Sequence, residues 1–286
     1  CDHFHAYLTA LQIRYPGLST LYSLNAARVD FIPYQFRPVL RFIRTDRPRL
    51  LIADSVGVGK TIEAGLILRE LQARRDIKTV LIICPRPLIT ERKWEIEMKR
   101  FDERFIQLNG SDLKYCISEM DLDGVWPDQY QKVILPYSLF DEILLFGSKA
   151  GQKRKKSKGL LDLDPPPRFD VVIVDEAHHI RNSNTYAHKA VRYFCDNAEA
   201  VLFLTATPIQ MGDEDLFVLL NMLRPDLILD PKSFEHMSEP NPFINQAVEV
   251  ARNQETSWTE RAREALDRAA STAWGRAILR YNPDFN

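Results

Sequence analysis

A glycine-rich turn followed by a lysine and a threonine is the first feature of this sequence that could do chemistry. The segment GVGKT at residues 57–61 follows a short apolar run and precedes a stretch with helical periodicity. Glycines let the backbone curl with its amides pointing inward, and a helix start favours an anion. The Lys60 ammonium can reach the β- and γ-phosphates of a nucleotide, and the Thr61 hydroxyl can bind Mg²⁺. The predicted phosphate-binding loop comprises Asp54, Ser55, Val56, Gly57, Val58, Gly59, Lys60 and Thr61.

The strict pattern for a nucleotide-binding loop is incomplete here. It requires a further glycine at the position that Asp54 occupies. Because backbone amides do the binding in such loops, we expect the phosphate site to survive this difference. The alternative is an ordinary glycine-rich turn between a strand and a helix, with Lys60 exposed on the surface. A second motif is needed to distinguish the two interpretations.

That second motif is a pair of carboxylates at the end of another apolar run, FDVVIVDEAHH at residues 169–179. Buried β-branched residues deliver Asp175 and Glu176 to the end of a strand, where two acids are costly without a cation or a task. We expect Asp175 to hold Mg²⁺ and Glu176 to orient and deprotonate an attacking water. The alternative is a pair of helix-capping acids. The glycine-rich turn upstream favours the catalytic interpretation.

These residues need a scaffold, and the sequence predicts one by alternating short apolar runs with longer amphipathic segments. Apolar runs separated by helices indicate parallel strands, because parallel strands need long crossovers. We therefore predict an α/β domain with a doubly wound parallel sheet, whose ligands bind beyond the carboxyl ends of the strands. The predicted strands are 49–54, 79–85, 132–137, 169–178 and 200–208, and the predicted helices are 61–75, 88–101, 138–146 and 184–198.

Two regions depart from this alternation. Residues 147–168 combine a basic run, KRKKSK at 153–158, with three prolines, and predict an exposed insertion loop. The basic run is either a solvated loop or a salt-sensitive phosphate contact. The segment 258–281 is polar and helical, so we expect a helical extension rather than a part of the sheet.

Composition limits the classes of function. The 286 residues carry a formal net charge of -1, which gives no global basic field for nucleic acid, so any such contact must be local. The four cysteines lack paired spacing, which argues against a zinc module and a disulfide framework and favours a reducing, cytoplasmic setting. No apolar run approaches the roughly 20 residues of a membrane span. The N-terminus does not resemble a signal peptide, and the chain begins without methionine, as expected of a fragment or a processed chain.

The ordered motifs GVGKT, DEAH and TATPIQ resemble motifs I, II and III of the superfamily-two helicases and translocases. The segment IADSVGVGKTIEAGLIL is most similar to the Swi/Snf-type branch and, within it, to the bacterial RapA-like group. Ser55 and Val58 differ from the usual residues of that group. The resemblance covers about residues 31–250, and implies ATP and Mg²⁺ as ligands. It implies a lead-in segment at 1–30, a RecA-like ATP-binding lobe at 31–230 and a helical extension at 231–286.

The resemblance also implies roles for single residues. Gln35 would read the adenine edge, and His178 would bridge motifs II and III. Thr205 and Thr207 would couple the γ-phosphate site to the nucleic-acid groove. Without the resemblance, His178 is equally a packed or capping histidine, and the two threonines are equally ordinary strand residues. The implied nucleic-acid contacts are Arg86, Lys93, Tyr137 and Ser138, each of which is also a plausible surface residue.

Three functions follow as hypotheses. The first is the first motor lobe of an ATP-driven translocase on double-stranded DNA. The second is a helicase of another superfamily-two branch that acts on RNA or single-stranded DNA. The third is a nucleotide-gated scaffold without turnover. Nothing after residue 230 resembles a second RecA-like lobe, so we expect this chain alone to have little or no turnover.

Overall fold

The computed structural model describes residues 21–23, 32–45, 47–54, 57–148, 157–206, 213–253 and 257–281. By its internal contacts the chain divides into two compact units, Cys1–Leu223 and Arg224–Asn286. None of the described helices combines the length and the apolar character needed to cross a bilayer.

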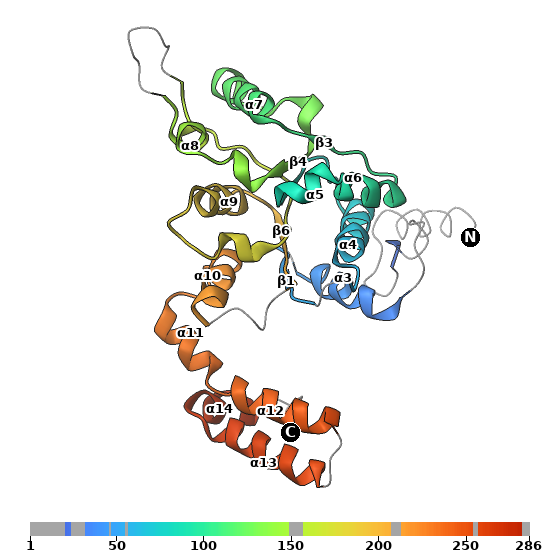
Figure 1. The fold of residues 1–286 in the computed structure, drawn as a ribbon, viewed down its shortest axis with the longest axis vertical. Helices are drawn as coiled ribbons and strands as arrows, with labels where there is room; N and C mark the ends of the chain where they lie inside the picture. Colours follow the sequence, from blue (N-terminus) through green and yellow to red (C-terminus); the bar gives the residue numbers. More distant parts are fainter. Residues whose placement is uncertain are drawn as a thin grey trace, which may run out of the picture. The chain divides into compact units, whose positions relative to one another are not determined.

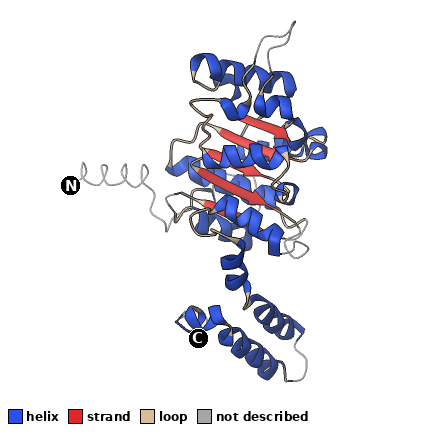
Figure 2. Ribbon diagram, turned by 90° about the vertical axis from the view of Figure 1, so that its left-hand side faces the viewer, coloured by secondary structure: helices blue, strands red, loops and turns tan. Residues whose placement is uncertain are grey.

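Six parallel strands form the centre of the first unit, with helices on both sides (Figures 1 and 2). Their order in the sheet is β1-β6-β5-β2-β4-β3, so the chain crosses over repeatedly and winds in both directions. The predicted doubly wound parallel α/β fold is confirmed, and a helical C-terminal region follows it. The strands are β1 (Arg49–Ile52), β2 (Val80–Cys84), β3 (Ile106–Gln107), β4 (Lys132–Pro136), β5 (Val171–Val174) and β6 (Ala200–Leu204).

Each face of the sheet has its own apolar core, because successive strand residues point to opposite faces. In β2, Leu81 and Ile83 belong to one core, whereas Val80, Ile82 and Cys84 belong to the other. The first core is covered by α7 (Gly110–Asp123), α8 (Glu142–Phe146), α9 (Tyr186–Asp196) and α10 (Asp213–Leu223), and the second by α3 (Phe36–Phe42), α4 (Lys60–Arg74) and α6 (Lys93–Met98) (Figure 1). Burial on both faces explains why the strands are continuously apolar.

Between β2 and β4 the structure contains a short strand and a helix that were not predicted from the sequence. The strand β3 has two residues, and Ile106 is largely exposed, so it leaves no apolar run to detect. The helix α7 begins at a capping box in which Asn109 accepts hydrogen bonds from the Ser111 and Asp112 amides. Its buried side chains recur at helical spacing: Leu113, Cys116, Ile117 and Met120.

Two predicted helices begin or break at other places. The predicted helix 88–101 is divided into α5 (Arg86–Thr90), α6 and the 3₁₀ turn η2 (Lys99–Phe101), because Arg92 adopts a left-handed conformation with φ of 54°. The predicted helix 138–146 is a 3₁₀ turn, η4 (Tyr137–Leu139), followed by α8. The Asp141 side chain caps α8 and sets its start.

The prediction of an exposed insertion loop at 147–168 is wrong for its second half. Leu160 and Leu163 are buried in the core beneath α7, α8 and α9, and the turn η5 (Leu160–Asp162) is part of the packing. The prolines therefore shape a packed connection into β5. Lys158, at the end of the basic run, forms a 2.6 Å ion pair with Asp121, whereas residues 149–156 lie outside the described part.

The second unit is helical. The helices α12 (Asn241–Asn253) and α13 (Trp258–Ser271) pack through small side chains, and the Arg268 guanidinium lies 4.5 Å from the centre of the Phe243 ring. The Glu239 carboxylate accepts a hydrogen bond from the Ala273 amide at 3.1 Å. Its helices are α11 (Pro231–Ser238), α12 (Asn241–Asn253), α13 (Trp258–Ser271) and α14 (Ala273–Ala277), with a final 3₁₀ turn, η7 (Leu279–Tyr281).

Candidate nucleotide and nucleic-acid site

The glycine-rich turn leads from β1 into α4, as the sequence predicts. Gly57 and Gly59 have φ of 87° and 93°, a region that residues with a Cβ rarely adopt, and Gly59 caps the start of α4. The Lys60 ammonium donates a hydrogen bond of 2.8 Å to the carbonyl of Asp54, which closes the turn on itself. Ser55 and Val56 lie outside the described residues.

Gln35 lies directly against this turn. Its side chain is 4% exposed, and its amide Nε2 donates a hydrogen bond of 3.0 Å to the carbonyl of Val58. The Tyr34 hydroxyl donates to the same carbonyl at 2.8 Å. A Cβ on Gly59 would lie 2.4 Å from Gln35 Nε2, the end of a flexible side chain, so the φ of 93° is the stronger reason for glycine here. The structure therefore joins the segment before α3 to the glycine-rich turn.

Glu63, which the sequence analysis did not single out, occupies the first turn of α4. Its side chain is fully buried, and both carboxylate oxygens lack a hydrogen-bond partner within the described part of the chain. Burial and, to a smaller extent, the Asp54 carboxylate raise the pKa of Glu63 to about 7, whereas the Lys60 ammonium acts in the opposite direction. The sequence signal that could have identified Glu63 is its position, since it is an acidic residue two places after Thr61 in the predicted helix.

The acid pair follows β5 directly. Asp175 is 5% exposed, and both of its carboxylate oxygens accept hydrogen bonds of 2.9 Å: Oδ1 from the Glu176 amide and Oδ2 from the Trp94 indole. Burial raises the pKa of Asp175, and the hydrogen bond from Trp94 opposes that rise. The chain then turns sharply, because Glu176 adopts a left-handed conformation with φ of 52°. Its carboxylate is partly exposed and lies 3.3 Å from His178 Nδ1.

The two corners open on the same edge of the sheet. In the strand register, β6 pairs Leu204 with Ile52 of β1 and Phe203 with Val174 of β5, so the carboxyl ends of all three strands are level. Neighbouring strands lie about 4.8 Å apart, which puts β1 and β5 about 10 Å from each other. The glycine-rich turn after β1 and the Asp175 carboxylate after β5 are therefore close enough for one nucleotide with its cation to contact both.

Thr205 follows β6 and therefore lies between these two corners. It is fully buried, and its amide donates a hydrogen bond of 3.0 Å to the Ile52 carbonyl. Thr207 lies outside the described residues. Coupling by the two threonines remains a prediction, as does the bridging role of His178, whose ring stacks on that of His179 with the centroids 4.6 Å apart.

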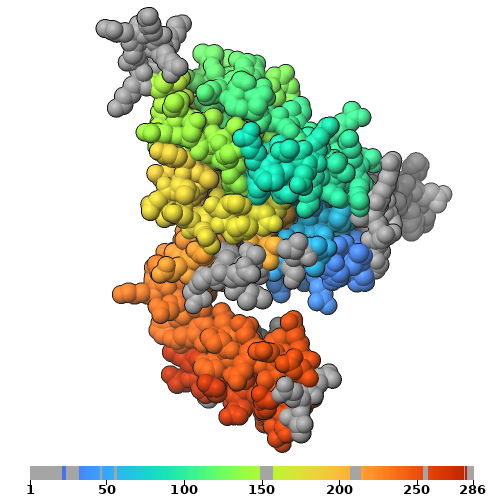
Figure 3. Space-filling view, viewed as in Figure 1, coloured from blue at the N-terminus to red at the C-terminus, as the bar shows by residue number. Residues whose placement is uncertain are grey.

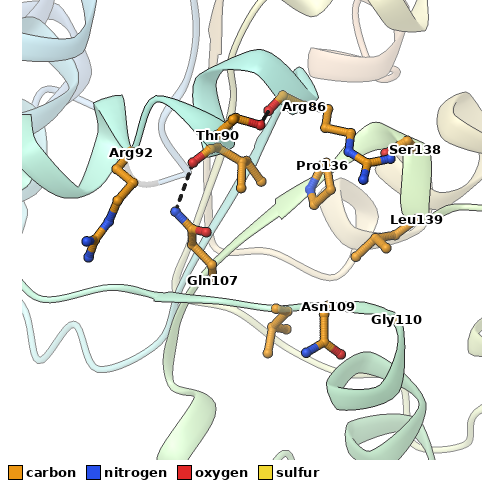
Figure 4. A pocket seen from close by; sticks show the side chains of 11 residues that line it. Arg86, Thr90, Arg92, Gln107, Asn109, Gly110, Pro136, Ser138 and Leu139 are labelled. Carbon is orange, nitrogen blue, oxygen red and sulfur yellow. Dashed lines mark hydrogen bonds between the residues drawn. The ribbon is translucent and has the colours of Figure 1, made fainter.

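The predicted nucleic-acid contacts lie beyond the ends of β2 and β4. Arg86 and Ser138 line one cavity of about 690 Å³, together with Thr90, Arg92 and Gln107 (Figure 4). The last three come from α5, the left-handed break and β3, and were not predicted from the sequence. Gln107 is fixed there by a hydrogen bond of 3.1 Å from its Nε2 to the Ile89 carbonyl (Figure 4).

Lys93 and Tyr137 do not line this cavity. Lys93 is exposed at the start of α6. Tyr137 is half-buried and donates a hydrogen bond of 2.8 Å from its hydroxyl to the backbone carbonyl of Asp175. The surfaces of α5 and α6 and of the segment after β5 lie side by side (Figure 3).

Comparison with known proteins identifies the family and the fold. The sequence matches the SNF2-related domain over residues 34–256. It is 32% identical over 236 residues to the RNA polymerase-associated protein RapA of Pasteurella multocida, covering 81% of this chain and 23% of that protein. It is 33% identical over 248 residues to the Haemophilus influenzae protein of the same name, covering 85% of this chain and 25% of that protein. The chain thus spans about a quarter of the length of these relatives.

A solved structure is similar in fold. The SWI2/SNF2 ATPase core of Sulfolobus solfataricus, determined in complex with double-stranded DNA, superposes with a TM-score of 0.55 at 19% identity, covering 93% of this chain and 49% of that one. At this identity the likeness concerns the fold. The match of the SNF2-related domain to most of the sequence shows the family, and the chain belongs to the SNF2-related domain family.

Proposed function

We propose that this chain is the ATP-binding lobe of a Swi/Snf-type, RapA-like translocase that couples ATP hydrolysis to movement on double-stranded DNA. One observation carries the proposal: the glycine-rich turn after β1 and the acid pair after β5 open on the same edge of the sheet, separated by β6. Family membership supports the same function. A cytoplasmic location belongs to the proposal.

The turn after β1 would bind the phosphates of ATP. The two glycines allow its amides to face an anion, and α4 adds the positive end of its helix dipole. The Lys60 ammonium would exchange its hydrogen bond with the Asp54 carbonyl for one with the β- and γ-phosphates. Gln35, anchored at Val58, would present its remaining amide atoms to the adenine.

Thr61 and Asp175 would hold Mg²⁺. Each carboxylate oxygen of Asp175 accepts one hydrogen bond, and an ionised oxygen has a further lone pair for a cation or its water. Mg²⁺ sites on nucleotides commonly use one or two carboxylates together with phosphate and water oxygens, so one buried aspartate fits the ion. The bound ion would neutralise charge on the phosphates.

Glu176 would orient the attacking water and accept its proton. Its carboxylate follows the metal-binding residue directly and, unlike that of Asp175, is partly open to solvent. The neighbouring His178 Nδ1, at 3.3 Å, would steady the carboxylate in this role. We propose that turnover also requires a second RecA-like lobe with an arginine finger, as the family uses.

Double-stranded DNA is the proposed nucleic-acid partner. The Sulfolobus solfataricus core of similar fold was solved with double-stranded DNA. In this chain, Arg86 and Ser138 line one cavity and Lys93 is exposed nearby in sequence, which supports contacts with a phosphate backbone. Such contacts are salt-dependent, so affinity for duplex should fall as salt rises.

Nucleotide binding tests the proposal. Fluorescence anisotropy of a labelled ADP, titrated with the 286-residue chain in the presence of Mg²⁺, should show saturable binding. Lys60→Ala should weaken it by about 10- to 100-fold or more, because a hydrogen bond to a charged group contributes about 1.5–3 kcal/mol. Lys114→Ala, at an exposed position of α7, is the control and should bind as the unmutated chain does. Equal affinity of the Lys60 and Lys114 variants would contradict the assignment.

The competing functions separate in a turnover assay. ATP hydrolysis by the complete polypeptide encoded by the gene is measured with duplex DNA, single-stranded DNA and RNA in turn. Preferential stimulation by duplex DNA supports the translocase. Preference for RNA or single strands favours a helicase of another superfamily-two branch, and nucleotide binding without turnover favours a nucleotide-gated scaffold.

A further inference from the structure

Asp175 is held by three hydrogen bonds, two of which come from residues far away in the sequence. The Trp94 indole donates to its Oδ2 across 81 residues, and the Tyr137 hydroxyl donates to its carbonyl across 38 residues. The Glu176 amide donates to its Oδ1. Both the side chain and the backbone of this one residue are therefore fixed by other elements.

The Trp94 indole donates its hydrogen bond to a carboxylate, which burial of the ring alone does not require. Trp94 is 1% exposed, and it belongs to the apolar core beneath α4 and α6. A buried indole N–H needs one acceptor, and a backbone carbonyl satisfies it, as the Tyr130 carbonyl does for Trp126 at 2.8 Å. The acceptor of Trp94 is instead the carboxylate of Asp175. A hydrogen bond to an ionised acceptor is roughly twice as strong as a neutral one.

The contact also selects one orientation of the carboxylate. With Oδ2 bound to the indole and Oδ1 bound to the Glu176 amide, rotation about the side-chain bonds would break both hydrogen bonds. The lone pairs left for a cation then point in fixed directions. Outer hydrogen-bond partners of this kind orient metal ligands, and their loss commonly costs 10- to 100-fold in metal affinity.

We propose that Trp94 is a positioning residue for the Mg²⁺ carboxylate of the nucleotide site. The inference rests on the proposed function, since it assigns Trp94 to the ion that Asp175 would hold. The competing explanation is that Trp94 fills the core and that its N–H takes the nearest acceptor without consequence for the ion.

Trp94→Phe distinguishes the two, because it keeps an aromatic ring in the core and removes the donor. The experiment measures binding of labelled ADP by the full 286-residue chain as a function of Mg²⁺ concentration, and again in EDTA. The Mg²⁺ concentration at half-saturation should rise about tenfold or more, whereas binding in EDTA should stay within about twofold. Trp126→Phe is the matched control, since it makes the same change elsewhere in the core, and its Mg²⁺ requirement should equal that of the unmutated chain.

A second measurement needs no change at Trp94. The indole N–H signals of ¹⁵N-tryptophan-labelled chain are assigned by elimination through W126F, W258F and W274F, which leaves that of Trp94. Addition of Mg²⁺ to the ADP-bound chain should shift the Trp94 signal and leave that of Trp126 in place.

The outcomes are separable. If the unmutated chain does not bind the nucleotide, the proposed function fails, and this inference fails with it. If the chain binds but W94F and W126F have the same Mg²⁺ requirement, or the Trp94 signal does not respond to Mg²⁺, the inference alone is overturned.

Discussion

Glu176 combines a strained backbone with a carboxylate that is partly open to solvent. A non-glycine residue in the left-handed region costs on the order of 1 kcal/mol, and here the cost falls directly after a fully buried strand. The turn separates the environments of two adjacent acids. Asp175 is buried and hydrogen-bonded through both oxygens, whereas the Glu176 side chain is partly exposed. One position suits a fixed cation ligand, and the other suits a base that exchanges protons with water.

Glu176→Gln should separate binding from hydrolysis. The amide has the same size and backbone preference, so labelled ADP should bind to the chain within about twofold of the unmutated affinity. Without a carboxylate to take the proton, ATP hydrolysis by the complete polypeptide should fall by about 10²- to 10⁴-fold. A phosphate-release assay measures this rate. Hydrolysis at the unmutated rate would show that another group is the base.

At the scale of elements, α4 connects the glycine-rich turn to the core through an unusually close contact. Gly65 lies in the middle of α4, and a Cβ there would be 2.3 Å from the ring of Phe101. Phe101, on η2, is fully buried and has no room to retreat. The backbone of α4 therefore rests on an aromatic ring, and this contact fixes the helix that begins at Lys60.

Gly65→Ala should destabilise the chain although alanine is the better helix former. The helix propensity gain is at most about 1 kcal/mol, whereas overpacking of a closed core costs about 1–3 kcal/mol or more. We expect the steric cost to prevail and the urea midpoint to fall. Gly110→Ala is the control, because its Cβ would make an ordinary 3.9 Å contact with Leu139 at the start of α7. A higher midpoint for the Gly65 variant would mean that the Phe101 ring moves aside.

Elements with a strong local signal were predictable from the sequence. The strands β2, β5 and β6 are apolar throughout because both of their faces are buried, and α9 shows helical periodicity. Features set by distant contacts were not. The left-handed Arg92 divides a segment that reads as one helix, and Leu160 is buried although prolines and charges surround it in the sequence.

The same distinction holds for the candidate site. Lys60, Thr61 and Asp175 were predictable from the sequence, because their side-chain chemistry and their motifs are those of a nucleotide site. The part that Trp94 plays depends on a partner 81 residues away, and an isolated tryptophan in a helix predicts burial and nothing more. Gln107 and Arg92 reach the cavity through β3 and a backbone break that leave no pattern in the sequence.

At the scale of the whole molecule, the two units differ in how much apolar surface they bury. The central strands β2, β5 and β6 are buried at every residue. In the described part of the second unit the buried apolar side chains are mostly small: Phe234, Ala247, Val250, Ala265 and Ala269. Since burial stabilises by about 25 cal/mol per Å² of apolar area, the second unit gains much less.

Native-state hydrogen exchange should therefore resolve the two units. The amides of β2, β5 and β6 should exchange most slowly, with the free energy of global unfolding, and those of α12 and α13 should exchange at least about tenfold faster. Mass spectrometry of peptic peptides measures both. Equal protection across the whole chain would indicate that the two units unfold as one.

The hydrogen bonds that meet at Asp175 have a consequence for how the protein is made. Along the chain, Trp94 follows β2, Tyr137 follows β4 and Asp175 follows β5. The hydrogen bonds from Tyr137 and Trp94 to Asp175 span 38 and 81 residues. Contacts of such long sequence separation form late, because the loops between them must close first. A partly folded chain can display its glycine-rich turn, yet it cannot offer an oriented carboxylate to an ion. If Asp175 holds Mg²⁺ as proposed, uptake of a magnesium nucleotide would therefore require a sheet that has already closed.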